Sequence, residues 1–488
     1  MDVARSVSLM VVVAVAVVLA AGPSLLAKDP VPTPAGEGMM SEVDAYLLRT
    51  LYASEDADAG LASIASTPEF KALVAKHDLK LFGGPVLGCV TDVSARLWVR
   101  TPGPAKVKAV VSADKGLTKP IETQTVQTRA AGDFTALLDV TGLKPSTTYY
   151  YDVLVDGASA CRASDVYGHK APRFKTFPAK GEKAKFDVGF GGGARYTPQH
   201  EHMWDTIASR RLAAFCFLGD NVYIDKPLLR NTQRVHYYRR QLRPEYRRFA
   251  ASAGIYAIYD DHDFGKNDCA GGLDPVLPEW KVPVWRVFKE NWNNPYYGGG
   301  EKVYGCWFDF TIGDVQFFML DNRYYRDFKK GWMLGPVQQK WLLDKLAASK
   351  AKFKVLANGT LWTEHADKGG KDSWWGVPEK REEVFSLIDR KKIPGVILIS
   401  ADRHRTDVYR IKRPNGYDLW EFETSKLTNV HTHGTRKPAE FSYNKGNFFG
   451  MFSFDMAAAD PTVTFRCITI DDKEVYSKTL KLSDLGGK

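Results

Sequence analysis

The chain has 488 residues, of which 44% are hydrophobic and 25% charged, a composition that excludes a largely disordered protein. This length allows two or three domains. The formal net charge of +10 fits either the attraction of anionic substrates or simple solubility. Six cysteines with no CxxC pair argue against a disulfide framework and against a zinc–thiolate site, although Cys89 and Cys161 could pair.

The first 27 residues have the layout of a secretory signal peptide. Arg5 lies near the start, residues 11–21 are an unbroken apolar run, and small residues follow. The alternative is a membrane anchor, but the run is short for a membrane span and Gly22-Pro23 ends it. The sequence therefore predicts an exported protein, periplasmic or extracellular, with no stable membrane anchor after cleavage.

Residues 28–81 are expected to form a linker and N-terminal helices. Residues 30–40 are rich in proline and glycine. A helical pattern then runs over residues 41–52, with Ser41 as the expected N-cap, and a second one covers residues 68–76. These helices are interpreted either as a lid over a site or as packing.

Residues 82–178 have the pattern of a small β domain. Residues 94–100, 106–111 and 147–155 alternate between apolar and polar side chains, as half-buried strands do. Turn signals such as Thr101-Pro-Gly-Pro104 separate them. Short strands at this spacing predict a fibronectin- or immunoglobulin-like β-sandwich.

Strands alternate with helices from residue 184 to residue 488, which predicts an α/β domain. Several of its apolar strands are followed directly by polar residues of metal-binding or catalytic type. Ligands of layered α/β folds bind beyond the carboxyl ends of the strands, so these residues are expected to meet at one site. They are Asp220, Asp260 to Asp263, Asp321, Asn358, Asp402 and His404.

Carboxylates combined with histidine and tyrosine make a hard-to-borderline ligand set. This set suits iron, manganese, zinc or calcium better than copper(I). Two such metal ions can hold an attacking water and a transferring phosphoryl group together. Asp220 is the natural bridging carboxylate, and the ligand set extends over Asn221, Tyr223, Asp261, His262, Asp402 and His404.

Each of these residues also has a simpler interpretation. His262 beside Asp261 could protonate a leaving oxygen, or it could be a surface histidine in a turn. Tyr223 could be a core aromatic residue. Asp321 and Arg323 are interpreted as a buried ion pair that orders the site. The number and order of the motifs, and no single residue, favour the functional interpretation.

The ordered motifs resemble those of the PhoD-like (alkaline phosphatase D) metallophosphatase family. The resemblance covers roughly residue 82 to the C-terminus, and Gly88-Cys-Val-Thr and Leu97-Trp-Val-Arg-Thr101 fit its N-terminal part. The motifs of the larger domain are Gly219-Asp220-x-x-Tyr223, Tyr259-Asp-Asp-His-Asp263, Leu320-Asp-x-Arg-Tyr324, Gly335-x-x-Gln338-x-x-Trp341-Leu, Asp372-Ser-Trp-Trp-Gly376, Ser400-x-Asp-x-His404 and Glu423-Thr-Ser-Lys-Leu-Thr-Asn429.

The resemblance implies a four-layer α/β/β/α metallophosphoesterase domain, an iron–calcium centre and hydrolysis of phosphate monoesters or diesters by a metal-activated water. Asp220 would then bridge the metals, and Tyr223 would bind iron. Asp261 stands where the wider superfamily has a metal-binding asparagine. The remaining implied roles are catalysis by His262 together with Asp261, and metal binding by Asp402, His404 and Asn267.

One position departs from the family pattern. The family carries a cysteine ligand after its first strand, whereas this chain has Gly193 in Phe190-Gly-Gly-Gly-Ala-Arg195, so a thiolate–iron bond is impossible there. The glycines are expected either to present N–H groups to a phosphate or to form a tight turn with positive φ. Substrate contacts are predicted for Arg195, Asn221 and Arg323.

The leading hypothesis is an exported metallophosphatase or phosphodiesterase that acts on a phosphorylated small molecule. A diesterase specialised for an anionic polymer, such as cell-wall material or nucleic acid, is the alternative enzyme, with nucleic acid only as a substrate. The third hypothesis is a non-catalytic pseudoenzyme that binds an anionic surface polymer, which the missing cysteine would favour.

Overall fold

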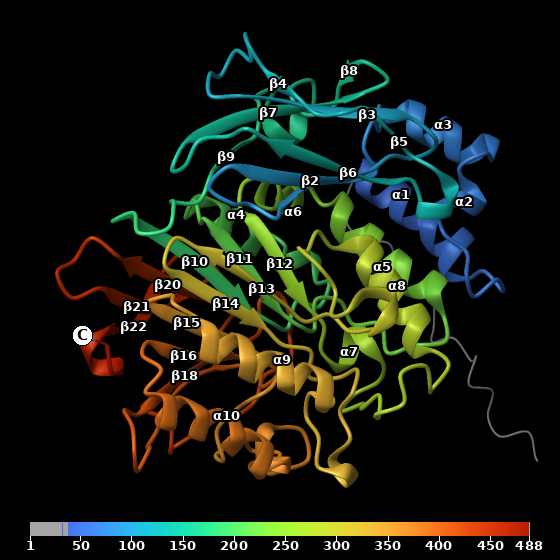
Figure 1. Ribbon diagram of the computed structural model, residues 1–488. Helices are drawn as coiled ribbons and strands as arrows, with labels where there is room; N and C mark the ends of the chain where they lie inside the picture. Colours follow the sequence, from blue (N-terminus) through green and yellow to red (C-terminus); the bar gives the residue numbers. More distant parts are fainter. Residues whose placement is uncertain (1–31, 33–37, 488) are drawn as a thin grey trace, which may run out of the picture.

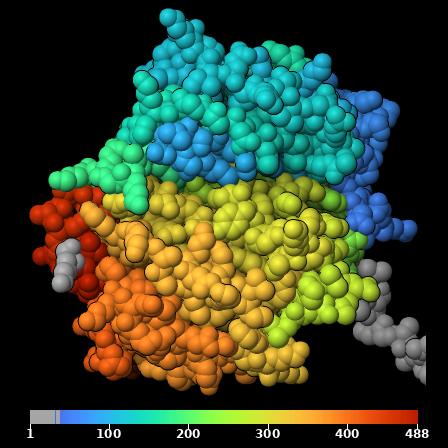
Figure 2. Space-filling model, viewed as in Figure 1, coloured from blue at the N-terminus to red at the C-terminus, as the bar shows by residue number. Residues whose placement is uncertain are grey.

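The computed structural model describes residue 32 and residues 38–487, so the predicted signal peptide lies outside the described residues (Figure 1). The N-terminal helices and two small sheets, blue to teal in Figure 1, lie against a larger α/β region. Figure 2 shows the two regions in broad contact. Within the described part of the chain, no helix is long and apolar enough to cross a bilayer.

The N-terminal helices are α1 (Met39–Leu47), continued by the π-helical turn η1 (Leu48–Tyr52), α2 (Leu61–Ile64) and α3 (Pro68–Lys76). The prediction of Ser41 as an N-cap is wrong, because Glu42 N–H donates to the Gly38 carbonyl and the helix begins at Met39. These helices pack on α5 (Arg230–Leu242) through an apolar cluster that includes Leu47 and Val235.

Residues 83–175 form two antiparallel sheets that share one core with the larger region. The first has the order β1-β2-β6, and the second has the order β4-β3-β7-β8, with β5 beside β3 and β9 beside β7. The strands are β1 (Gly83–Gly88), β2 (Ser94–Arg100), β3 (Lys106–Ser112), β4 (Ile121–Glu122), β5 (Val126–Gln127), β6 (Thr135–Thr141), β7 (Thr148–Val155), β8 (Ala158–Ser159) and β9 (Arg173–Lys175). All six cysteines are free, so Cys89 and Cys161 are not paired.

The larger region contains a six-stranded sheet with the order β12-β11-β10-β20-β21-β22. Its strands β10, β11 and β12 are parallel, and β10 pairs antiparallel with β20. The strands are β10 (Lys185–Gly191), β11 (Ala214–Leu218), β12 (Gly254–Ile258), β20 (Phe448–Asp455), β21 (Thr462–Thr469) and β22 (Glu474–Lys481).

A seven-stranded sheet has the order β13-β14-β15-β16-β18-β17-β19, in which β14, β15, β16 and β18 are parallel. Parallel strands end at the same edge of their sheet, so the loops that follow them gather there. The strands are β13 (Phe308–Ile312), β14 (Val315–Met319), β15 (Phe353–Ala357), β16 (Val396–Ser400), β17 (Thr406–Ile411), β18 (Leu419–Thr424) and β19 (Phe441–Tyr443).

Side chains alternate between the two faces of the seven-stranded sheet. Phe317 contacts Phe454 of the six-stranded sheet, whereas Phe318 packs on Trp341 of α9 (Gly335–Ala348). On the six-stranded sheet, Trp204 of α4 stacks on Phe249 of α6. Aromatic burial thus joins the sheets to one another and to their helices.

The remaining helices connect or cover these sheets. They are α4 (Met203–Ser209), α6 (Pro244–Ala250), α7 (Asp261–Phe264), α8 (Lys281–Asn291) and α10 (Pro378–Lys391). Short 3₁₀ turns lie at Ala130–Gly132, Asp165–Tyr167, Pro198–His200, Gly300–Lys302, Phe328–Lys330, Trp374–Gly376 and Ser483–Leu485.

Candidate metal centre

The loops after β11, β12 and β16 meet around a cavity of about 1020 Å³. The convergence of strand-end residues expected from the sequence is observed for Asp220, His262, Asp402 and His404. The other members of the expected set do not line the cavity, namely Asp260, Asp261, Asp263, Asp321 and Asn358. Residues from the segment after β18 complete the wall. The site residues predicted from the sequence that line this cavity are Arg195, Asp220, Tyr223, His262, Asn267, Asp402 and His404.

Tight turns after the strands place these side chains. Asp220, Asp402 and His404 have φ angles of 52°, 81° and 47°, a left-handed conformation that non-glycine residues rarely adopt. A Cβ on Gly219 would lie 2.3 Å from Asp260 Cβ, so the turn after β11 requires glycine. Strained backbone held by the surrounding structure is typical of functional sites.

Asp220, Tyr223 and His404 form one hydrogen-bonded group. The Tyr223 hydroxyl donates to Asp220 Oδ2 at 2.7 Å and lies 2.9 Å from His404 Nε2. His404 Nε2 is 3.8 Å from Asp220 Oδ2. A carboxylate, a phenol and an imidazole, each a possible metal ligand, therefore meet at one point of the cavity.

Several buried polar atoms of this site lack a hydrogen-bond partner within the described residues. They are Asp220 Oδ1, Asp402 Oδ2 and His404 Nδ1. Burial, with Asp261 nearby, raises the pKa of Asp220 to about 7, and burial raises the pKa of Asp402 well above its usual value. Buried ionised groups are costly unless paired or bound to metal, so these atoms fit a metal centre.

His262 is oriented by a residue that sequence reasoning missed. Its Nδ1 lies 2.7 Å from Asp225 Oδ1, and its ring packs 4.3 Å from the Tyr223 ring. Burial alone would lower the pKa of His262, but the carboxylates of Asp220, Asp225 and Asp261 raise it to about 10. The three carboxylates therefore favour the protonated form of the imidazole. The available signal was the position of Asp225 on the Tyr223 loop.

Asp261 lies behind the cavity wall rather than on it. It is 1% exposed, and its Oδ2 accepts the Asp268 N–H at 2.6 Å. Ligand atoms of Asp220, Asp261 and His262 still lie within 4.8 Å of one another. Asn267 is exposed at the cavity and hence accessible to a ligand there.

Two predicted substrate contacts take other positions. The side-chain amide of Asn221 donates to the Ile258 carbonyl at 2.9 Å, and its backbone N–H donates to Asp263, which ties the loops after β11 and β12 together. Arg323 is fully buried. Neither residue lines the cavity, so their geometry supports a structural role instead of contact with substrate.

Arg323 also has partners other than the expected one. Its guanidinium pairs with Asp260 and lies 2.9 Å from Asp372. Asp321 accepts the backbone N–H of Arg323 and does not pair with its guanidinium. The predicted Asp321–Arg323 ion pair is therefore wrong. Although burial opposes it, positive charge from Arg323, Arg326 and Lys368 holds the pKa of Asp372 well below its usual value. The carboxylates of Asp260 and Asp372 are thus neutralised by cationic side chains of the protein.

Gly193 occupies a position that no other residue fits without rearrangement. Its φ is 68°, and a Cβ there would lie 2.8 Å from Lys426 N and 3.3 Å from His404 Cδ2. The expected tight turn with positive φ is confirmed. The neighbouring N–H groups of Gly192 and Ala194 donate to the Thr424 and Asp220 carbonyls, so they are not available to a phosphate.

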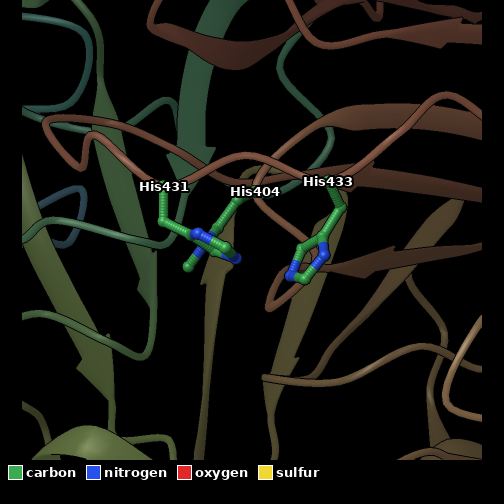
Figure 3. A group of neighbouring side chains, drawn as sticks. All are labelled: His404, His431 and His433. Atoms are coloured by element: carbon green, nitrogen blue, oxygen red, sulfur yellow. The ribbon is translucent and has the colours of Figure 1, made fainter.

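Sequence reasoning also missed two histidines that approach His404. Figure 3 shows the rings of His404, His431 and His433 grouped together. One ring nitrogen of each lies within 4.8 Å of the others. Burial and neighbouring positive charge lower the pKa of His404 and of His433 to about 3. Their spacing, His-x-His in an irregular segment, was the only signal.

This fold defines the chain as a metallophosphoesterase-like α/β protein. The solved structure of PhoD covers 81% of this chain and 92% of its own, with a TM-score of 0.64 and 18% identity. The purple acid phosphatase PPD1 of yellow lupin (Lupinus luteus) covers 82% of this chain and 74% of its own, with a TM-score of 0.60 and 12% identity. Identities this low establish similarity of fold alone.

The family model of PhoD-like phosphatases matches residues 188–455, and the chain belongs to this family. The family resemblance read from the motifs is thus confirmed. A domain of unknown function, DUF7800, matches residues 78–173. Alkaline phosphatase D of Bacillus subtilis (strain 168) is 23% identical over 357 residues, which are 61% of this chain and 58% of that protein. The chain thus spans less than two thirds of this relative's length.

Proposed function

We propose that this protein is an exported, metal-dependent hydrolase of phosphate monoesters or diesters. The observation that carries the proposal is the convergence of Asp220, His262, Asp402 and His404 at one cavity, with Asp261 directly behind its wall. Ligand atoms of Asp220, Asp402 and His404 lack hydrogen-bond partners within the described residues. Structural ion pairing alone would leave these atoms satisfied. Membership of the PhoD-like phosphatase family supports the same reaction class.

The residues that would hold metal ions are Asp220, Tyr223, Asp261, Asp402 and His404, with Asn267 at the edge of the cavity. We expect two ions, drawn from iron, calcium, manganese and zinc, because the donors are oxygen and nitrogen. When bound, such ions lower the pKa of a coordinated water and neutralise charge on a phosphoryl group.

His262 supplies the proton in the proposed reaction. Water adds to phosphorus, the bond from phosphorus to the ester oxygen breaks, and the protonated His262 gives its proton to that oxygen. Asp225 holds Nδ1 at 2.7 Å, so Nε2 is the nitrogen that remains for the transfer. A proton from solvent restores the imidazolium after the alcohol has left.

Cationic side chains of the cavity would hold the phosphate. Arg195 is exposed and lines the cavity, and a guanidinium forms bidentate bonds with phosphate oxygens. Lys368 also lines it, with Nζ 3.7 Å from Asp402 Oδ1. We infer that Arg195 contacts the outer oxygens of the substrate, while Lys368 mainly balances the buried carboxylates.

One wall of the cavity supports the alternative of a polymer diesterase. Tyr52, Tyr196, His236 and Arg239 line it, and the Arg239 guanidinium lies 4.6 Å from the centre of the Tyr196 ring. Aromatic side chains of this kind can stack on the bases of a long leaving group. A non-catalytic polymer-binding role gains less support, because the oriented His262–Asp225 pair serves proton transfer, not binding.

The proposal also includes the architecture and the location. We infer a four-layer α/β/β/α order for residues 184–488 from the helix, sheet, sheet and helix contacts of Trp341, Phe317, Phe454 and Trp204. A fibronectin- or immunoglobulin-like sandwich for residues 82–178 is supported by two antiparallel sheets. Export is supported by the signal-peptide pattern of residues 1–27.

Elemental analysis of purified protein, followed by assays on p-nitrophenyl phosphate and bis-p-nitrophenyl phosphate with iron, manganese, zinc and calcium, tests the function. Hydrolysis that requires metal supports it, and the ratio of the two rates separates monoester from diester preference. Protein that binds none of these metals and hydrolyses neither ester contradicts the proposal and favours the polymer-binding alternative.

A further inference from the structure

A group of three histidines lies at the side of the cavity that the family cysteine would occupy. The ring centres of His404 and His431 are 5.3 Å apart, those of His404 and His433 are 5.7 Å apart, and those of His431 and His433 are 4.7 Å apart. In Figure 3 the rings come from two separate segments of the chain and converge on one volume. Such convergence is not a product of sequence proximity.

We propose that His404, His431 and His433 form a nitrogen-rich metal position, selective for a borderline divalent ion such as zinc, in place of the family's thiolate–iron site. Imidazole is a preferred ligand for zinc, and three protein ligands with an open fourth position suit a metal that acts in catalysis. Calcium, which takes oxygen ligands, is not expected at this position.

Hydrogen bonds to the backbone of the three histidines fix the segments that carry them. The Thr432 hydroxyl donates to the His404 carbonyl at 3.1 Å, and the Asn444 amide donates to the His433 carbonyl at 2.9 Å. Asn429 Oδ1 accepts the N–H of His431 at 3.1 Å. The segment that carries the two histidines is therefore anchored on both sides and tied to the loop of His404.

Gly193 links this position to the absent cysteine. The Gly193 carbonyl accepts the N–H groups of Thr428 and Asn429, which places the start of the histidine segment. Because a Cβ on residue 193 would lie 2.8 Å from Lys426 N and 3.3 Å from His404, a cysteine there would displace this packing. Glycine at residue 193 therefore permits the packing that places the histidine segment, and the histidines supply ligands in place of the thiolate.

The neighbouring charges leave the histidine group available to a cation. His404 Nδ1 is buried and lacks a partner within the described residues. Arg403 Nη2 lies 3.3 Å from His433 Nδ1, but Arg403 Nε is already paired with Asp367 Oδ1 at 2.7 Å. If a metal ion binds His433 and displaces the Arg403 guanidinium from it, Arg403 therefore still has Asp367 as a partner.

Zinc binding to the chelator-treated full-length protein tests the proposal without any activity measurement. Isothermal titration with Zn²⁺ is run on the wild type, on the double variant His431→Ala/His433→Ala and on the control His169→Ala, an exposed histidine of the N-terminal region. We expect the double variant to lose one zinc equivalent, or at least about 100-fold in affinity, since even outer-shell changes cost 10-fold to 100-fold. The control should bind as the wild type does.

X-ray absorption at the zinc edge should show nitrogen neighbours at about 2.0–2.1 Å in the wild type and fewer in the double variant. Calcium titration should be unchanged by the double substitution. A second pair, His431→Asn/His433→Asn, and thermal melts of the metal-free proteins check that the loss is not unfolding.

Equal zinc stoichiometry and affinity in the wild type and in both folded double variants would overturn the proposal. That result would leave the proposed hydrolysis standing, because hydrolysis is measured separately with saturating metal. Conversely, zinc loss in the double variants with no esterase activity in the wild type would reject the proposed function alone.

Discussion

The two sheets of the larger region contribute different chemistry to the same cavity. The loops after β11 and β12 supply buried carboxylates and the oriented His262, whereas the loop after β16 and the segment after β18 supply Asp402 and three imidazoles. Carboxylates suit hard ions, and imidazoles suit borderline ions. The centre therefore has an oxygen-rich side and a nitrogen-rich side, which predicts two metal positions of different preference.

The two sides also differ in the charge of their side chains and in how that charge is neutralised. On the oxygen-rich side, Arg323 pairs with Asp260 and Asp372, so these carboxylates are neutralised internally, while Asp220 Oδ1 has no hydrogen-bond partner within the described residues. On the nitrogen-rich side, the rings of His404 and His433 stay neutral because burial lowers their pKa values to about 3. Neutral imidazole is the form that binds metal. The histidines on this side can therefore bind a metal ion without first losing a proton.

The largest expected effect comes from His262→Ala, which removes the proton donor but no member of the histidine group. We expect kcat to fall about 10²-fold to 10⁴-fold. The metal content should equal that of the wild type, as measured by elemental analysis. Unchanged phosphoesterase activity would show that His262 does not act as the acid.

Asp225→Asn should reduce kcat less, by about 10-fold to 100-fold, since it removes orientation and not the proton donor. The carboxylate of Asp225 is one of the groups that raise the pKa of His262 to about 10. Its loss lowers that pKa, so the acid loses its proton at lower pH and the alkaline limb of the pH–rate profile moves toward neutrality. An unshifted limb would contradict the assignment.

Gly193→Ala tests, through the free energy of unfolding, whether the packing of residue 193 against Lys426 and His404 matters. A non-glycine residue in the left-handed region costs about 1–2 kcal/mol. The contact with Lys426 adds to this cost, so the loss of unfolding free energy measured in urea should exceed the backbone cost alone. Gly142→Ala is the matched control, because its φ is 77° but nothing lies within 4 Å of the added Cβ. Equal losses at both positions would mean that the packing against Lys426 and His404 is unimportant.

The smallest effect is expected for Asp367→Asn on the nitrogen-rich side. Burial opposes ionisation, but Arg403 and Arg405 lower the pKa of Asp367 below its ordinary 3.8. A lowered pKa adds stability above pH 3.8 that is lost as the pH falls below that value. The variant should lose about 1 kcal/mol or less at pH 7. The difference from the wild type in urea unfolding should shrink below pH 4, and a constant difference would contradict this account.

Much of the oxygen-rich side was predictable because the candidate ligands Asp220 and Asp261 closely follow buried strands. An apolar run ending in Gly219-Asp220 or in Asp260-Asp-His-Asp263 places its carboxylates at the sheet edge, whatever the rest of the chain does. For two of the predicted substrate contacts, the position depended on the direction in which the side chain points. Asn221 and Arg323 follow strands too, but their side chains turn into the protein, where Ile258 and Asp372 offer partners.

Residue type and local order were enough to predict the family, the strand-end candidate ligands and the absence of a thiolate at residue 193. Which residues join them at the cavity depends on how distant segments of the chain pack together. His431 and His433 lie in an irregular segment whose position depends on contacts with Gly193, His404 and Asn444. Long-range hydrogen bonds of this kind leave no periodic pattern in the sequence, so the nitrogen-rich side of the centre appeared only once the chain was folded.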